Sequence, residues 1–143
     1  KVTPVIKSNA EVLTFWEQEN KGAHKIMCMG AAEEIDVLYT TLESLFSNEI
    51  ILYRSKDTYI EISHKDISKK TAIEVILKNC YPTISMDKVI AFGDNYNDIE
   101  MLKAVGLGVA VANANVEVLK VADAITDTNK NDGVAKAIKE FII

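Results

Sequence analysis

A group of polar side chains directly follows a short apolar stretch in the second half of the sequence. The stretch is residues 89–92, and after it two acids, Asp94 and Asp98, bracket the amides Asn95 and Asn97. In open parallel sheets, ligands bind beyond the carboxyl ends of the strands, which is where these groups would lie. Carboxylate and amide oxygens suit Mg²⁺, which takes one or two carboxylates and completes its octahedron with water and substrate phosphate. The group predicts a magnesium site; the alternative is that Asp94 only turns the loop and Asp98 only caps a helix.

Two lysines, Lys69 and Lys70, open a predicted helix directly after Ser68. Cations in the first turn of a helix oppose the macrodipole, and a local rule broken in this way is expected at functional sites. Backbone N–H groups and a lysine at a helix start favour an anion, most naturally phosphate. The alternative is a solvated lysine pair. Phosphoryl transfer places a cation and a metal on the same oxygens, so the lysine and the acidic group support one another.

The first part of the chain has the pattern of an α+β unit. Apolar residues recur at helical spacing over two segments, and three segments rich in β-branched and aromatic residues predict strands. The predicted helices span residues 9–20, after Asn9 as N-cap, and 33–46, and the strands span residues 25–29, 50–54 and 59–63. Turn residues between the last two strands predict an antiparallel hairpin. Four aromatics are assigned to the core, and Arg54 is read as an ordinary strand residue that could face a substrate; the aromatics are Trp16, Tyr39, Phe46 and Tyr53.

The pattern changes near residues 64–67, after which strands and helices alternate. Strands are predicted at residues 89–92, 107–111 and 122–126, and helices after Ser68 and at residues 98–105, 116–121 and 132–143. This alternation predicts an α/β arrangement with a parallel sheet. The entirely apolar strand at residues 89–92 is expected to be fully buried. The last helix is expected to turn five residues inward, namely Val134, Ala135, Ile138, Phe141 and Ile142.

Composition excludes several function classes. A net charge of −5, from 16 basic and 21 acidic residues, argues against nucleic-acid binding, which needs a basic surface. No apolar run approaches the roughly 18 residues that a membrane helix needs, and no signal-peptide pattern is present. Cys28 and Cys80 fit no zinc or CxxC spacing, so we expect free, buried thiols in a cytoplasmic protein.

Together these residues resemble the haloacid dehalogenase superfamily, specifically its Cof-type capped phosphatases. The resemblance is carried by Ser68-Lys69, by residues 91–102 (AFGDNYNDIEML), by residues 106–114 (GLGVAVANA) and by residues 131–134 (NDGV). It implies a partial Rossmann-like core over residues 65–143, preceded over residues 1–64 by part of an α+β cap that selects the substrate. Lys70 and Ala112 stand where glycine is usual in that family.

The resemblance also implies an activity and a role for each site residue. The implied activity is Mg²⁺-dependent hydrolysis of small phosphorylated metabolites, such as sugar phosphates, through an aspartyl-phosphate. Lys69 would be catalytic, steadying the nucleophile and the phosphate charge, and Asn97 would lie near the phosphate. Asp94 would be a metal ligand, and Asp98 would support the metal site.

One departure from the family is large. The nucleophile of such enzymes lies in a DxDGT-like motif near the N-terminus, and no Asp-x-Asp-Gly occurs in these 143 residues. The chain, which starts at Lys1 without a methionine, is therefore expected to be the second half of such an enzyme and to be inactive alone. Removal of the nucleophile strand would expose an apolar sheet edge near residues 89–92, so self-association through this edge is expected. The alternatives are a non-catalytic binding or regulatory module and a phosphomutase of the same superfamily.

Overall fold

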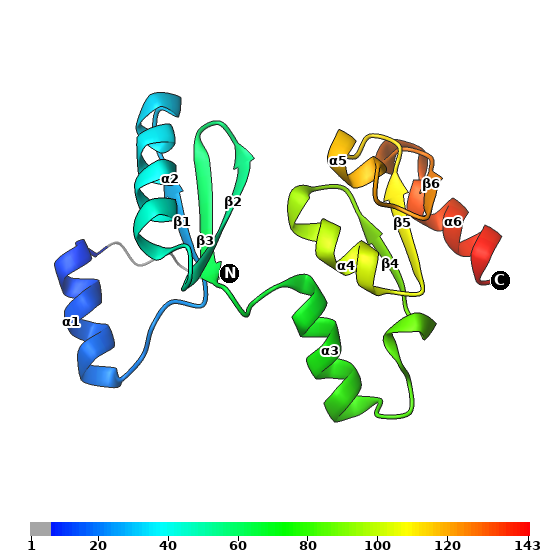
Figure 1. Ribbon diagram of the computed structural model, residues 1–143, viewed down its shortest axis with the longest axis horizontal. Coiled ribbons are helices and arrows are strands. Elements are labelled where there is room, and N and C mark those ends of the chain that lie inside the picture. The colour runs from blue at the N-terminus through cyan, green and yellow to red at the C-terminus, as the bar shows by residue number, and fades with distance from the viewer. Residues whose placement is uncertain (1–6) are drawn as a thin grey trace.

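The computed structural model describes residues 7–143, apart from the side chain of Ser55, and contains two three-stranded sheets (Figure 1). One sheet is antiparallel and lies in the first half of the chain, and the other is parallel and lies in the second half. This confirms the predicted α/β fold class, with an α+β unit preceding a parallel sheet. Among the described residues, no helix has both the length and the apolar character needed to cross a bilayer.

The antiparallel sheet has the strand order β1-β3-β2 and carries helix α2 on one side. Its elements, together with the preceding helix, are α1 (Asn9–Glu19), β1 (Ile26–Met29), α2 (Ala32–Phe46), β2 (Ile50–Lys56) and β3 (Tyr59–His64). Ile35 of α2 and Ile60 of β3 are almost completely buried, because the apolar stripe of the helix packs on the central strand. The predicted hairpin is confirmed, with Leu52 facing Ile62 in the β2–β3 register. Helix α1 is capped by Ser8 rather than by Asn9, since the Ser8 side chain accepts from the Glu11 amide.

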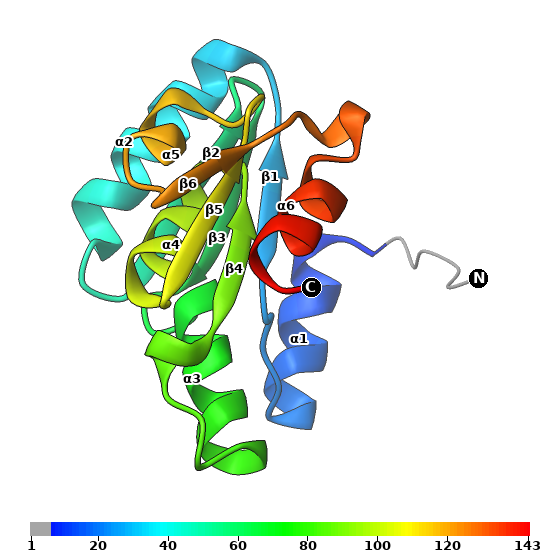
Figure 2. The ribbon, with the colours of Figure 1, turned by 90° about the vertical axis from the view of Figure 1, so that its right-hand side faces the viewer.

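The parallel sheet has the strand order β4-β5-β6 and is flanked by helices (Figure 2). Its elements are α3 (Lys69–Cys80), η1 (Met86–Lys88), β4 (Ile90–Gly93), η2 (Tyr96–Asp98), α4 (Ile99–Ala104), β5 (Leu107–Val111), α5 (Val116–Leu119), β6 (Ala124–Thr126), η3 (Asn129–Asn131) and α6 (Gly133–Phe141). The central strand β5 is the best buried, with Val109 and Ala110 fully covered. Leu102 of α4 and Val118 of α5 complete this core.

The expectation that residues 89–92 form a fully buried strand is wrong. Within the described residues β4 pairs with β5 alone and lies at the edge of the sheet. Ala91 is buried, whereas Ile90 and Phe92 are only half-buried. An apolar run indicates that both faces of a strand pack against apolar groups, but it does not indicate whether the strand pairs with one neighbouring strand or with two.

The inward face predicted for the last helix is also wrong. Helix α6 buries Gly133 and Ala137, whereas Val134 and Phe141 are about 40% exposed, at 38% and 41%. The small residues allow a close approach: a Cβ on Gly133 would lie 1.9 Å from the Asp127 carbonyl oxygen. Val134 and Phe141, three residues before and four residues after Ala137, lie near this buried side of the helix but remain partly exposed, and Ile138 is half-buried.

The two cysteines are free, as predicted, but they are not both buried. Cys28 in β1 is half-buried, and Cys80 is exposed. Cys80 is the last residue of α3 and precedes an exposed turn, residues 81–85, so no element covers it.

Candidate functional site

Lys69 and Asp98, which the sequence separates by 29 residues, are joined by an ion pair. Lys69 is the first residue of α3, and its amine donates a hydrogen bond to Oδ1 of Asp98 at the end of η2. The Asp98 side chain is 1% exposed, whereas the Lys69 side chain is 50% exposed. The second lysine is also paired, since the Lys70 amine lies 3.5 Å from the Glu74 carboxylate. Each of the two positive charges that oppose the α3 macrodipole therefore has an acidic partner.

The second oxygen of Asp98 organises the loop that follows β4. Oδ2 accepts hydrogen bonds from the backbone amides of Asp94, at 2.9 Å, and Asn95, at 3.1 Å. The side chain of Asn95 in turn accepts from the amide of Tyr96, at 2.8 Å, and caps η2. Gly93 is required beneath this arrangement, since a Cβ there would lie 2.6 Å from Cβ of Asp98. The loop is thus held from its centre by one buried carboxylate.

Asp98 is an anion whose charge is held by its surroundings. Burial of the carboxyl group opposes ionisation, but the Lys69 amine and the Asp94 and Asn95 amides outweigh it and lower the pKa of Asp98 below its ordinary value. A group in this state is a fixed negative charge at neutral pH. It can orient a lysine and stabilise nearby positive charge, but it is not suited to donate a proton.

The predicted metal residues lie in this one loop. Asp94 is exposed, whereas Asp98 already has both oxygens engaged in hydrogen bonds, so Asp94 offers the freer carboxylate. Over residues 7–143 no group of three or more His, Cys, Asp or Glu side chains is placed so that it could hold a metal ion by itself. The free carboxylate of Asp94 nevertheless fits Mg²⁺, which keeps several water ligands and binds through one or two acids. Asn97, predicted to lie near phosphate, is half-buried in η2 beside Asp98.

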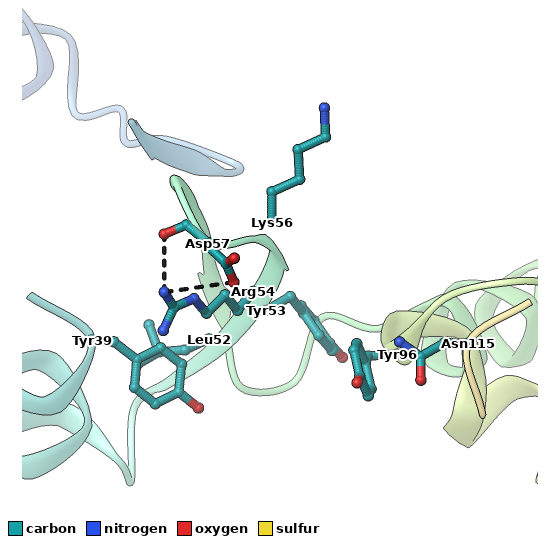
Figure 3. A pocket seen from close by; sticks show the side chains of 8 residues that line it. All are labelled: Tyr39, Leu52, Tyr53, Arg54, Lys56, Asp57, Tyr96 and Asn115. Atoms are coloured by element: carbon teal, nitrogen blue, oxygen red, sulfur yellow. Dashed lines mark hydrogen bonds and ion pairs between the residues drawn. The ribbon is translucent and has the colours of Figure 1, made fainter. Parts of the chain in front are cut away.

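A pocket of about 560 Å³ lies between the antiparallel sheet and the loop after β4 (Figure 3). Its lining comes from α2, from the β2–β3 hairpin and from two loops beside the parallel sheet: Tyr39, Leu52, Tyr53, Arg54, Lys56, Asp57, Tyr96 and Asn115. The pocket adjoins the acidic loop, because the amide of Asn115 donates to the Asp94 carbonyl at 2.9 Å. Burial, with the negative charges of Glu100 and Asp98, raises the pKa of Tyr53.

The assignment of Tyr39 and Tyr53 to the core is wrong, because both line this pocket and are half-buried. Phe46, also assigned to the core, is 41% exposed. Arg54 faces the pocket, as the sequence allowed, and its guanidinium is paired with the Asp36 carboxylate. Apolar spacing identifies the side of an element that avoids water, but it does not distinguish a packed core from a pocket wall.

A second polar cluster follows β6 at the same end of the parallel sheet. The Asp127 carboxylate accepts from the Lys136 amine at 2.5 Å, from the Thr128 amide at 2.7 Å and from the Asn131 amide group at 3.2 Å. These bonds lower the pKa of Asp127 to about 2. The cluster fixes the turn into α6, which explains the NDGV segment structurally.

Comparisons with known proteins point to one family of hydrolases. Residues 3–138 match the family model described as haloacid dehalogenase-like hydrolase. The chain is 41% identical over 112 residues to the 5-amino-6-(5-phospho-D-ribitylamino)uracil phosphatase YcsE of Bacillus subtilis, covering 78% of this chain and 44% of that protein. The chain spans about half the length of the curated relatives it matches.

Solved structures share the fold. A haloacid dehalogenase-like hydrolase from Bacteroides thetaiotaomicron aligns with a TM-score of 0.73 and 36% identity, covering 85% of this chain and 45% of that one. The subclass IIB sugar phosphatase BT4131 aligns with a TM-score of 0.71 and 26% identity, covering 89% of this chain and 46% of that one.

Proposed function

Because this chain belongs to the haloacid dehalogenase-like hydrolases, we propose that the whole protein is a Mg²⁺-dependent phosphatase of small phosphorylated metabolites. The observation that carries the proposal is the Lys69–Asp98 ion pair beside the exposed carboxylate of Asp94. This arrangement puts a cation, a fixed anion and a free carboxylate at the carboxyl end of a strand. That combination serves a phosphate group and a divalent cation together.

In this proposal Lys69 and three residues that follow β4 each have one role. The Lys69 ammonium has three N–H donors and donates one to Asp98, so the other two remain for phosphate oxygens. The Asn97 amide donates to the same phosphate. Asp94 holds Mg²⁺ directly, and Asp98 supports the site by fixing the loop amides and Lys69. When bound, Mg²⁺ neutralises phosphate charge and orients the group.

The attacking group and the acid–base group are proposed to come from a segment that precedes these residues in the whole protein. An aspartate there attacks phosphorus while the ester P–O bond breaks, which forms an aspartyl-phosphate. A second carboxylic acid gives its proton to the departing alkoxide and then takes a proton from the water that hydrolyses the intermediate. Since no Asp-x-Asp-Gly occurs in the chain, we propose that these 143 residues alone release no phosphate.

The lack of that motif also favours a second candidate, a binding module without catalysis. Such a module would have little reason to keep a lysine, an amide and two acids in these sequence positions together, which favours the phosphatase. The coding sequence upstream of Lys1 separates the two candidates. A DxDGT motif there supports the phosphatase, and a start codon next to Lys1 supports the module.

The relatives suggest two classes of substrate for the whole protein. One class carries a pyrimidine ring, as in the ribitylaminouracil phosphatase, and the other is a plain sugar phosphate. In this proposal the antiparallel sheet and α2 are part of the cap, and their residues in the pocket select between the two substrate classes.

The test joins the upstream half to this chain and measures phosphate release from a panel of phosphorylated metabolites with and without Mg²⁺. We expect Mg²⁺-dependent release that Asp94→Asn lowers at least about a hundredfold, because the variant removes the freer metal ligand. Asp87→Asn is the matched control, since Asp87 lies in η1, before β4, at the opposite end of the strand. Equal activity in both variants, or no release from any ester, would overturn the proposal.

A further inference from the structure

We propose that Asn115 is a positioning residue for Asp94. Its backbone amide donates a hydrogen bond to the Asp94 carbonyl and, through that bond, sets the direction of the carboxylate that would hold Mg²⁺. This inference rests on the proposed phosphatase function, because it uses the Mg²⁺ site of that proposal. It gives a role to a residue of a different loop, the one between β5 and α5.

The carboxylate of Asp94 is not held by contacts of its own. It is exposed and takes part in no hydrogen bond or ion pair with another described residue. The Asp98 carboxylate, by contrast, has both oxygens engaged. The direction of the Asp94 carboxylate therefore depends on the backbone that carries it, because the backbone sets the Cα–Cβ bond and leaves only the side-chain rotamers free.

Two hydrogen bonds hold the backbone of Asp94, one on each side of its Cα atom. Its amide donates to Oδ2 of Asp98 at 2.9 Å, and its carbonyl accepts from the amide of Asn115, also at 2.9 Å. The two planar peptide units that flank the Cα atom are thus both restrained. Without the Asn115 bond, the peptide unit that contains the Asp94 carbonyl loses this restraint while the amide stays on Asp98.

Asn115 presents its amide from a fixed position at the start of α5. Its side chain accepts from the Glu117 amide at 3.2 Å, and its carbonyl accepts from the Val118 amide at 2.9 Å. Val118 is fully buried and anchors α5 in the core. An N-cap amide has no partner inside its own helix, so the amide of Asn115 is available to Asp94.

The pairing of the two strands brings the two loops together. Gly93 at the end of β4 lies opposite Ala110 of β5, so both strands end at the same edge of the sheet. Groups that orient a metal ligand without touching the metal typically change metal affinity by about 10–100-fold when they are removed. In this proposal the Asn115 amide is such a group for Asp94.

Proline at position 115 removes the amide donor while fitting the local backbone. The φ angle of Asn115 is −59°, close to the angle of about −65° that proline imposes. Asn115→Ala is the matched control, because it loses the same capping side chain but keeps the amide. The affinity of each variant chain for Mn²⁺ is measured from the broadening of the amide signals of residues 94–98. We expect Asn115→Pro to bind Mn²⁺ about tenfold or more weakly than Asn115→Ala does.

The outcomes separate this inference from the proposed function. Equal Mn²⁺ affinity in the two variants overturns the positioning role and leaves the metal site standing. If the parent chain shows no selective broadening at residues 94–98, the metal site fails and the positioning role fails with it. The amide shifts of Val118 and Leu119 report whether α5 keeps its place in both variants.

If proline displaces α5, hydrogen exchange in the parent chain decides. Because coupling between two sites is reciprocal, saturation with Mg²⁺ should slow exchange of the Asn115 amide by about fivefold or more. The control is the Asp123 amide, which donates to the Gly108 carbonyl near the start of β5 and should exchange at an unchanged rate. An Asn115 amide that exchanges equally fast with and without Mg²⁺ overturns the positioning role.

Discussion

The amine of Lys69 binds the carboxylate of Asp98 across 29 residues of sequence and joins the start of α3 to the loop after β4. The acid is buried and the lysine is half-exposed, so the pair is open to a ligand on one side only. The positive end of the α3 macrodipole points to the same place. This single contact brings the starts of two helices together at the place where we propose that phosphate binds.

Removal of the lysine should destabilise the fold more than removal of its neighbour. Lys69→Met leaves the buried Asp98 charge without its cation, so we expect a loss of about 1–3 kcal/mol in the free energy of unfolding. Lys70→Met is the matched control, since it breaks only an exposed pair with Glu74, which is worth less than about 0.5 kcal/mol. Urea denaturation of the two variants measures the difference. Equal losses of unfolding free energy in the two variants would mean that the Lys69–Asp98 pair stabilises the fold no more than the exposed Lys70–Glu74 pair does.

Gly93→Ala should disturb the acidic loop. The new methyl group would lie 2.6 Å from Cβ of Asp98, so the loop must move, at a cost of about 1–3 kcal/mol. Gly22→Ala is the control, because nothing lies within 4 Å of a Cβ built there. Thermal unfolding and the amide NMR shifts of residues 94–98 report both effects. Unchanged shifts in Gly93→Ala would contradict the packing described for this loop.

Asp127 should contribute to the acid sensitivity of the fold. Its pKa of about 2 lies below the ordinary 3.8 because of the bonds from Lys136, Thr128 and Asn131. The folded state therefore favours the carboxylate, and its contribution to stability is full above about pH 4 and is lost as the pH falls toward 2. Asp127→Asn should lower the urea midpoint at about pH 6, and the gap to the parent should narrow at about pH 2.5. A gap that stays constant with pH would contradict the lowered pKa of Asp127.

The 143-residue chain should self-associate through β4. Within the described residues this strand uses only one of its two hydrogen-bonding edges, and its side chains are apolar. Such an edge tends to pair with another strand. We expect sedimentation to give a dimer or larger species, with the β4 amides protected from exchange. A monomer whose β4 amides exchange rapidly would contradict this expectation.

The sequence predicted the elements well because their patterns are local. The spacing of apolar residues located α2, the hairpin and β5 within a few residues, and the start of α3 was found at Ser68 and Lys69. The convergence of Lys69 with the acidic loop could also be anticipated, since both lie at the carboxyl end of the parallel sheet. These inferences depend on residue type and order alone.

The pocket could not be predicted in the same way. Its tyrosines come from three separate elements, and each tyrosine taken singly has the spacing of a core residue. Whether Tyr53 meets a packed core or a pocket depends on what lies opposite β2 in space, and the apolar pattern of the strand carries no information on that. The buried face of α6 was also misassigned, because apolar spacing weights the larger residues, whereas the helix buries Gly133 and Ala137.

The central claim is that the loop of Asp94 and Asp98 binds a divalent cation beside Lys69, and paramagnetic NMR with Mn²⁺ tests it most directly. Mn²⁺ accepts the same oxygen ligands as Mg²⁺ and broadens the signals of nearby nuclei. The account predicts that the amides of residues 94–98 broaden first and that Asp94→Asn abolishes this selectivity. Broadening that begins at other acidic positions, or that is unchanged in Asp94→Asn, would contradict the claim.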